Sequence, residues 1–461
     1  MTSPAEMAPA GPRQAPPRAI AGWLLFDWAT QPFYTLVTAF IFGPYFVAEI
    51  ARDPVAGQSQ WGLGAGIASL VIAILAPILG AIADAGGGRK IWIAGFSAML
   101  VGGSLLLWFA MPGTSPLLVL FVAAIATIGV EFATVFNNAM MPDLVPAHRI
   151  GRLSGAGWAL GYFGGLVATV IALGFLVADP ATGSTLFGLA PVFGLDAVEH
   201  GGDRAAGPFS ALWYVVFVLP LFLFTPDVPR RLAARAAVSA GLRQLRDTLR
   251  SLRHNAPVTR YLVAHMVYAD GLAALFAFGG IYGVGLFGWS SFELGVFGIL
   301  LTITGGLGAF LGGRLDDRFG PKRVILWSLA VLFVGSAGVL SIDETHIALF
   351  IAVEPAGEGD ATFGSTGERF YLLVGAIVGA AAGPLQSASR SMMVRLSPPD
   401  RITQLFGLHA LSGKVTSFLA TLGVSALTAL ATSQRVGLSL VLVFFAVGGF
   451  ILLGVRDRPA E

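Results

Sequence analysis

The chain has 461 residues, of which 55% are hydrophobic and only 12% are charged, and its mean hydropathy is +0.77. Soluble domains carry about twice that share of charged residues, so the composition excludes a soluble globular protein and indicates a helical membrane protein. The net charge is only +2, and the absence of cysteine excludes disulfide bonds, thiolate metal sites and thiol catalysis.

In chain order, residues 1–18 are rich in alanine and proline and predict a disordered tail. Hydropathy and helix-breaking residues then predict twelve membrane-spanning helices, six in residues 19–225 and six in residues 258–456, joined by a linker over 226–257. The approximate spans are 20–48, 61–84, 90–111, 116–141, 154–178, 208–225, 258–287, 292–314, 322–341, 370–395, 403–430 and 436–455. The predicted fold class is an all-α polytopic membrane protein.

The polar loops are repeated between the two halves. Gly80, Asp84, Arg89 and Lys90 recur as Gly313, Asp317, Lys322 and Arg323 at an offset of 233, and the segment 144–155 recurs as 396–407 at an offset of 252. Two copies in the same order predict two pseudo-symmetric six-helix bundles with a transport site between them. The difference between the offsets predicts an extra solvated loop in the second half, over 354–368.

Basic residues are concentrated in the loops on one side of the predicted membrane. The positive-inside rule therefore puts both termini in the cytoplasm, and the preference for arginine over lysine suggests a bacterial cytoplasmic (inner) membrane. In the linker, leucine and arginine alternate at helical spacing, which predicts an amphipathic helix on an anionic membrane surface rather than a nucleic-acid contact. These residues are Leu242, Leu245, Leu249, Leu252, Arg243, Arg246, Arg250 and Arg253.

Five charged residues fall well inside predicted spans, where a charge costs several kcal/mol unless it is paired or hydrated. They are Asp27, Glu131, Asp270, Arg390 and Lys414. The carboxylates are candidates for proton coupling because removal from water disfavours their charged form. The two cations would suit a substrate carboxylate. The alternative is that some are structural pairs, such as Asp270 with Lys414 or Glu131 with Arg390.

Polar residues accompany these charges at helical spacing. Gln31 and Tyr34 share a face with Asp27, Asn138 shares one with Glu131, and Gln386 shares one with Arg390. A polar stripe on a spanning helix must face a cavity or another helix, because lipid offers no hydrogen bonds. These residues therefore join the predicted substrate and proton pathway. His265 and His409 are either proton relays or hydrogen-bonded packing residues.

The repeated loops, G-x-x-x-D-x-x-x-x-[RK]-[KR], resemble the signature of the major facilitator superfamily. Four further stretches resemble its autophagy-related vacuolar effluxer (Atg22-like) branch. They begin F-D-W-A-T-Q-P-F-Y (Phe26–Tyr34), F-N-N-A-M-M-P-D-L (Phe136–Leu144), Y-A-D-G (Tyr268–Gly271) and G-P-L-Q-S-A-S-R-S (Gly383–Ser391). The eukaryotic family member is associated with export of amino acids from the vacuole.

The resemblance implies a twelve-helix rocker fold, alternating access and a substrate site near the midplane. It also implies that two cytoplasmic loops act as latches, in which each loop aspartate pairs with nearby basic residues. The latch residues are Asp84 with Arg89 and Lys90, and Asp317 with Arg318, Lys322 and Arg323. We expect the glycine run 86–88 to loosen the first latch.

We therefore predict a secondary active transporter, a proton-coupled symporter or antiporter, for a small polar or zwitterionic solute such as an amino acid. The alternatives are an exporter of amphipathic compounds or drugs, and a non-transporting membrane scaffold or receptor. Ser412-Gly413-Lys414 lacks the upstream glycine of a phosphate loop, so no nucleotide site is predicted. We expect no enzymatic activity, cofactor, metal or nucleic-acid partner, and we expect a monomer.

Overall fold

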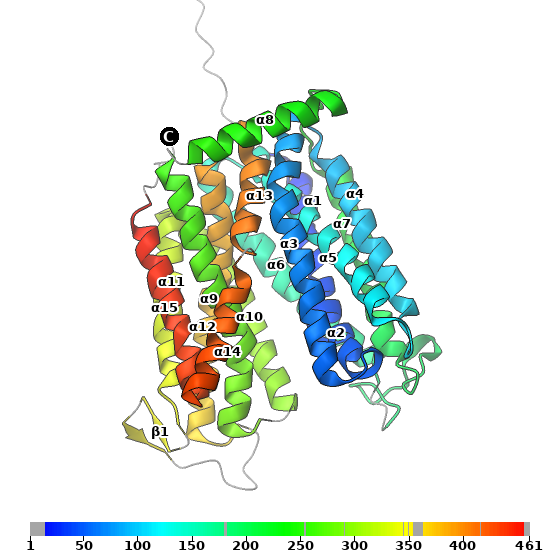
Figure 1. The fold of residues 1–461 in the computed structure, drawn as a ribbon, viewed down its shortest axis with the longest axis vertical. Coiled ribbons are helices and arrows are strands. Elements are labelled where there is room, and N and C mark those ends of the chain that lie inside the picture. Colours follow the sequence, from blue (N-terminus) through cyan, green and yellow to red (C-terminus); the bar gives the residue numbers. More distant parts are fainter. Residues whose placement is uncertain are drawn as a thin grey trace, which may run out of the picture.

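The computed structural model describes residues 14–178, 182–252, 255–289, 291–343, 345–348, 350–353, 363–414 and 416–455. Figure 1 shows long helices that run side by side, with one helix, α8, lying across one end. Within the described residues, eleven helical segments are long and apolar enough to cross a membrane. The all-α polytopic fold is therefore confirmed.

The first bundle contains six spanning segments. Its helices are α1 (Pro17–Pro32), α2 (Phe42–Tyr45), α3 (Pro54–Gly86), α4 (Arg89–Leu106), α5 (Pro116–Ala139), α6 (Ile150–Ile171) and α7 (Gly201–Phe224). The first segment continues beyond α1 in wider π-helical turns over Phe33–Phe40 and Phe46–Ile50. Such turns are often found at functional sites, and Tyr34 lies in the first of them.

The second bundle follows α8 (Ala234–Leu252). Its helices are α9 (Ala256–Phe287), α10 (Ser291–Phe319), α11 (Pro321–Leu340), α12 (Thr366–Leu396), α13 (Ile402–Ser412), α14 (Ser417–Ala431) and α15 (Gln434–Leu453). A two-stranded antiparallel hairpin of β1 (His346–Ile347) and β2 (Ile351–Ala352) lies at the end of the molecule opposite α8 (Figure 1).

The eleventh predicted span, 403–430, is not one helix. It is divided into α13 and α14, which are separated by residues 413–416. Gly413, a poor helix former, opens this break, and the backbone N–H of Lys414 bonds back to the carbonyl of Leu411 at 3.1 Å. Irregular backbone inside a membrane is tolerated where it lines a cavity, which is where Gly413 and Lys414 lie.

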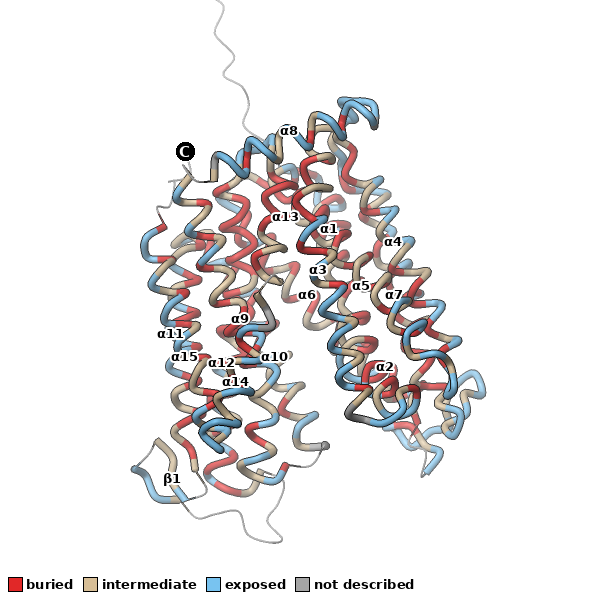
Figure 2. The backbone as a smooth tube through the Cα atoms, viewed as in Figure 1, coloured by how far each residue is buried: buried red, intermediate tan, exposed pale blue. Residues whose placement is uncertain are grey.

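The two halves meet at the end that carries α8 and diverge toward the other end (Figure 1). A Cβ on Gly80 of α3 would lie 2.6 Å from the carbonyl oxygen of Thr403 in α13. A Cβ on Gly313 of α10 would lie 2.6 Å from the carbonyl oxygen of Gly151 in α6. The two contacts are related by the offsets of the sequence repeats, 233 from Gly80 to Gly313 and 252 from Gly151 to Thr403. The repeated glycines therefore lie at two symmetry-related helix crossings, which are too close for any larger residue. Figure 2 shows buried backbone concentrated where the halves meet.

Helix α8 lies within the predicted linker, and one of its faces packs on the protein. Its buried face includes Gly241, where a Cβ would lie 2.7 Å from the backbone of Ile82 in α3, and Thr248, whose hydroxyl donates to Gln404 of α13 at 3.3 Å. The predicted leucines Leu242 and Leu249 are 47% and 48% exposed. Helix α8 therefore contacts both halves, and Leu242 and Leu249 point outward while Leu252 packs against the core.

Two predicted disordered or solvated segments are partly ordered. The tail was predicted to extend to residue 18, yet the N–H of Ala15 bonds to the carbonyl of Leu144 at 2.9 Å and α1 begins at Pro17. In the predicted outer loop, Glu368 is 5% exposed because it forms a capping box with Ser365 and accepts a hydrogen bond from Trp289. The remainder of the tail, residues 354–362 of the loop, and Arg253 of the linker lie outside the described residues.

Candidate functional site

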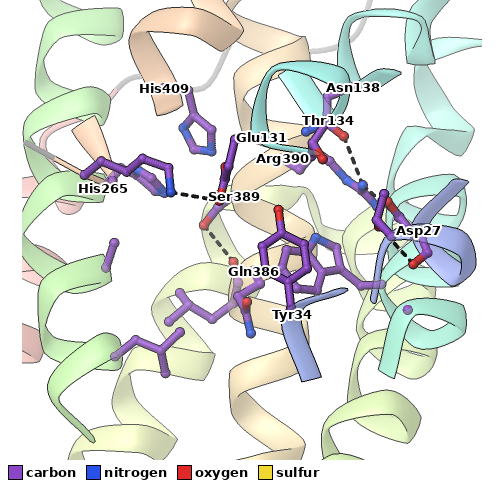
Figure 3. Close-up of a pocket in the computed structure, with 18 of the residues that line it drawn as sticks. Asp27, Tyr34, Glu131, Thr134, Asn138, His265, Gln386, Ser389, Arg390 and His409 are labelled. Carbon is purple, nitrogen blue, oxygen red and sulfur yellow. Dashed lines mark hydrogen bonds and ion pairs between the residues drawn. The ribbon is translucent and has the colours of Figure 1, made fainter. Parts of the chain in front are cut away.

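A cavity of about 540 Å³ lies between the two halves, walled by α1, α5 and α6 on one side and by α9, α12 and α13 on the other (Figure 3). Its lining residues are Asp27, Thr30, Gln31, Tyr34, Glu131, Thr134, Asn138, Trp158, Gly161, His265, Tyr268, Ala269, Leu272, Leu385, Gln386, Ser389, Arg390, His409, Gly413 and Lys414. A polar cavity inside a helical membrane protein is the expected form of a solute site.

Eight of the nine residues predicted for the pathway line this cavity. They are Asp27, Gln31, Tyr34, Glu131, Asn138, Gln386, Arg390 and Lys414. The ninth, Asp270 on α9, is 2% exposed and is not part of the lining, although the adjacent Ala269 is. The predicted polar and charged residues of four spans therefore line one cavity, and Asp270 lies beside it.

Arg390 on α12 is bonded entirely to the first half. Its guanidinium donates to Asp27 Oδ2 at 2.9 Å, to Asn138 Oδ1 at 3.0 Å, and to the hydroxyl and carbonyl oxygens of Ser154 at 2.9 and 2.7 Å. It also lies 5.1 Å from the ring centre of Trp23, a cation–π distance. With its side chain only 6% exposed, Arg390 cross-links the two halves.

A second ion pair joins the halves through Glu131 on α5 and Lys414 in the break between α13 and α14. Lys414 Nζ donates to Glu131 Oε1 at 2.9 Å. The side chains are 22% and 19% exposed, so this pair faces the cavity. The suggested pairs of Asp270 with Lys414 and of Glu131 with Arg390 are therefore wrong, because each cation pairs with a different carboxylate.

The second-half wall of the cavity carries three aromatic rings, those of His265, Tyr268 and His409. The rings of His265 and His409 are 3.8 Å apart between centres, and His265 Nδ1 shares a hydrogen bond with Ser412 Oγ at 2.8 Å. Tyr268 and Ser389 share a hydrogen bond of 2.7 Å. Both histidines therefore pack against each other, and both also line the cavity.

The lining residues that sequence reasoning missed include two large aromatic ones, Trp158 and Tyr268. Tyr268 lies in the Y-A-D-G motif two residues before Asp270. Only Asp270 was selected from this motif, because it is charged. Trp158 lies in the glycine-rich helix α6. A large aromatic side chain among small residues could have indicated a residue that faces a cavity. Within the described residues, no group of three acidic or histidine side chains is placed to hold a metal ion.

Gly157 of α6 is expected to be essential for the Asp27–Arg390 pair. A Cβ there would lie 2.8 Å from an Arg390 nitrogen and closer still to Asp27 Oδ2. We predict that Gly157→Ala separates the pair, lowers stability by about 1–3 kcal/mol and reduces flux in reconstituted vesicles. Gly161→Ala is the matched control, because its Cβ would have no neighbour closer than 3.5 Å. Equal behaviour of the two variants would contradict this assignment.

The two loop aspartates cap helices of the opposite half. Asp84 accepts hydrogen bonds from the backbone N–H groups of Thr403 and Gln404 at 3.1 and 2.8 Å, at the start of α13. Asp317 accepts one from the N–H of Arg152, at the start of α6, at 3.2 Å and pairs with its guanidinium at 2.9 Å. A carboxylate at a helix N-terminus is favoured by the exposed N–H groups and the helix dipole.

The basic partners of the aspartates agree only in part with those that the resemblance implied, since Asp84 keeps an ion pair with Arg89 but not with Lys90. Arg89 lies 3.9 Å from Asp84 but bonds more closely to Asp143, at 2.6 Å. Lys90 donates to the carbonyl of Phe222 at 2.9 Å. In the second loop, Asp317 pairs with Arg152 rather than with its own loop cations.

Those second-loop cations have other contacts. Lys322 donates to the carbonyls of Leu453 and Val455 at 2.9 and 2.6 Å, and Arg318 lies over the ring of Phe319. No partner of Arg323 is identified among the described residues. The second latch therefore depends on α6 rather than on the cations of its own loop.

The glycine run 86–88 holds the linker in place. The N–H of Gly88 bonds to the carbonyl of Val228 at 2.9 Å, and the N–H of Arg231 bonds to the carbonyl of Gly86 at 2.8 Å. Gly87 and Gly88 have φ values of +72° and +70°, which favour glycine, and a Cβ on Gly87 would collide with the Pro229 carbonyl. The run is thus a docking turn for the linker, which is different from the loosened latch that we expected.

Known proteins are similar to this chain over most of its length. A family model described as "Vacuole effluxer Atg22 like" matches residues 54–459. The chain is 25% identical over 441 residues to an "Uncharacterized MFS-type transporter YxiO" of Bacillus subtilis (strain 168), covering 95% of both chains. It is 24% identical over 362 residues to "Autophagy-related protein 22" of Yarrowia lipolytica (strain CLIB 122 / E 150), covering 72% of this chain and 56% of that protein.

A solved structure shows the same fold. It is a major facilitator superfamily transporter, FucP, in the outward conformation, which superposes with a TM-score of 0.68 at 15% identity and covers 96% of this chain and 99% of that one.

Proposed function

Because the chain belongs to the vacuole effluxer Atg22-like family and is a secondary transporter of the major facilitator superfamily, we propose that it carries a small zwitterionic solute, such as an amino acid, coupled to protons. The observation that supports this proposal most directly is the Glu131–Lys414 pair. It offers one anion and one cation, both partly exposed, to a single solute in the central cavity.

A zwitterion can replace the bond between Glu131 and Lys414 with one bond to each of the two residues. Its carboxylate would accept from Lys414 Nζ and its ammonium would donate to Glu131, so no charge would be left unpaired. A cavity of about 540 Å³ has room for such a solute. Gln31, Tyr34 and Gln386 supply uncharged hydrogen-bonding groups around it. An apolar drug would leave the two charges desolvated, which disfavours the exporter of amphipathic compounds.

Asp270 is the proposed proton carrier. It is 2% exposed, and it forms no ion pair with any described residue. Its Oδ1 atom is buried without a hydrogen-bond partner in the described part of the chain, and the Thr416 hydroxyl lies beside the carboxyl group. A bound proton would let the carboxyl group donate to the hydroxyl and would remove the buried charge. Asp27 and Glu131, by contrast, already face cations.

We predict that Asp270→Asn uncouples transport from the proton gradient. The amide resembles the protonated acid but cannot release a proton, so accumulation driven by a pH gradient should vanish while exchange of internal for external solute stays within about three-fold of wild type. The measurement compares both modes in proteoliposomes. Asp247→Asn on the exposed face of α8 is the control. Gradient-driven accumulation by Asp270→Asn would assign the coupling to another residue.

In alternating access, the two halves would separate at the α8 end, where they now meet, and would close at the opposite end. The cross-half contacts made by Asp84, Arg89 and Asp317 support their role as gating residues at that end, and Lys90, Arg318, Lys322 and Arg323 belong to the same loops. With this end in the cytoplasm, as the positive-inside rule predicts, both termini would be cytoplasmic and the state described would be outward-facing. We further propose a monomer in a bacterial cytoplasmic membrane.

Flux into proteoliposomes tests the function as a whole. Labelled amino acids and a set of amphipathic cations are offered with and without a pH gradient. Uptake of an amino acid that rises with the gradient supports the proposal. Uptake of amphipathic compounds alone favours the exporter, and folded protein that moves none of these solutes favours the scaffold or receptor. Amino-acid uptake without gradient dependence would contradict proton coupling and leave facilitated diffusion.

A further inference from the structure

A second cavity, of about 840 Å³, lies on the first bundle near α8 and shares no lining residue with the central one. Helices α3 and α4 form one side of it, and the linker with the start of α8 forms the other. Among its lining residues only Arg230 is charged, and the rest are apolar or glycine. It is therefore an apolar groove with a single cation.

The groove opens on the membrane-facing surface of α4. Ile91 is 53% exposed, and a Cβ on Gly95 would have no heavy atom within 4 Å. Trp92 and Phe96 are stacked along its wall, with 6.4 Å between ring centres. From Ile91 to Met99 the wall extends for roughly 12 Å along the helix. These dimensions suit part of an extended acyl chain.

The single cation of the groove, Arg230, lies on the side that the linker forms. Arg230 is exposed, its Cγ would lie 3.1 Å from a Cβ on Gly88, and no ion pair or hydrogen bond of its guanidinium is found within the described residues. Asp227, the nearest acid in the linker, already accepts from the backbone N–H groups of Arg89 and Lys90 at 2.9 and 3.1 Å. Arg231 adds further positive charge. The guanidinium is therefore available to an anionic group from outside the chain.

We propose that this groove binds an anionic phospholipid, with one acyl chain against α4 and the phosphate on Arg230. The linker over the groove is the segment that docks on the glycine run through the Gly88–Val228 and Arg231–Gly86 hydrogen bonds. A lipid bound here would hold the linker and α8 against the closed end. This site is independent of the identity of the transported solute.

The test uses the full-length protein in detergent, titrated with phosphatidylglycerol or with phosphatidylcholine of the same acyl chains. Bound lipid is counted by native mass spectrometry, and the shift in unfolding temperature is recorded. Phosphatidylglycerol should bind preferentially. Arg230→Gln should weaken its binding about five-fold, which corresponds to one cation near an anionic headgroup. Arg231→Gln, the matched control, should change the binding less than two-fold.

A third variant tests the groove itself. Gly95→Leu places a side chain beside α4 at a position where a Cβ would have no heavy atom within 4 Å, so it should prevent lipid binding with Arg230 intact. Equal binding of the two lipids, equal effects of the two arginine variants, or unchanged binding by Gly95→Leu would each overturn the proposal. The first outcome would indicate an unselective apolar groove, and the second would indicate diffuse attraction by the basic linker.

Discussion

Replacing Arg390 by leucine should abolish transport and lower the free energy of unfolding by about 3–5 kcal/mol. The substitution leaves Asp27 buried without its cation and removes the donors that Asn138 and Ser154 now accept from. Because all of these bonds cross between the halves, their loss should also destabilise the closed α8 end. Flux in proteoliposomes and thermal unfolding in detergent measure the two effects.

A double variant separates the structural effect from the functional one. Asp27→Leu with Arg390→Leu removes both charges, so it should recover most of the lost stability while remaining inactive. Arg369→Leu, at an exposed position of the same helix α12, should behave like wild type in both measurements. Wild-type stability in Arg390→Leu alone would mean that the cross-link contributes little to the closed state.

The fold could be predicted because it depends mainly on a property of short sequence segments, the run of apolar residues in each span. A spanning helix needs about twenty apolar residues wherever it lies in the bundle, so hydropathy located the spans within several residues. The repeated loops added the two-fold relation, and the structure explains why they repeat. Gly80 and Gly313 lie at the two equivalent crossings, and Asp84 and Asp317 cap the equivalent helices α13 and α6.

The charge pairs could not be predicted, because they depend on how helices are rotated and broken. Helical spacing shows that Glu131 and Arg390 face inward but not which partner each meets. Lys414 reaches Glu131 from the break between α13 and α14, and a continuous helix over 403–430 would present it differently. The partner of Asp317 was missed for a related reason, since Arg152 is distant in sequence and belongs to the other half.

Neutralising either member of the second pair should weaken solute binding strongly with little loss of stability. Glu131→Gln or Lys414→Gln leaves the remaining charge partly exposed in the cavity, where water can solvate it, so the free energy of unfolding should fall by no more than about 1 kcal/mol. Each variant removes a charge-assisted hydrogen bond to the solute, worth about 1.5–3 kcal/mol. The affinity for an amino acid, measured from the concentration dependence of uptake, should therefore weaken by roughly 10- to 150-fold.

Reversing the pair distinguishes a solute site from a structural bridge. In Glu131→Lys with Lys414→Glu the attraction between α5 and the α13–α14 break persists, so a pair that serves only to join the halves should regain transport. A pair that orients a zwitterion should not, because the solute would have to turn end for end while Gln31, Tyr34 and Gln386 keep their places around it. Folded but inactive protein is the expected result. Recovered flux would show that Glu131 and Lys414 act on each other and not on the solute.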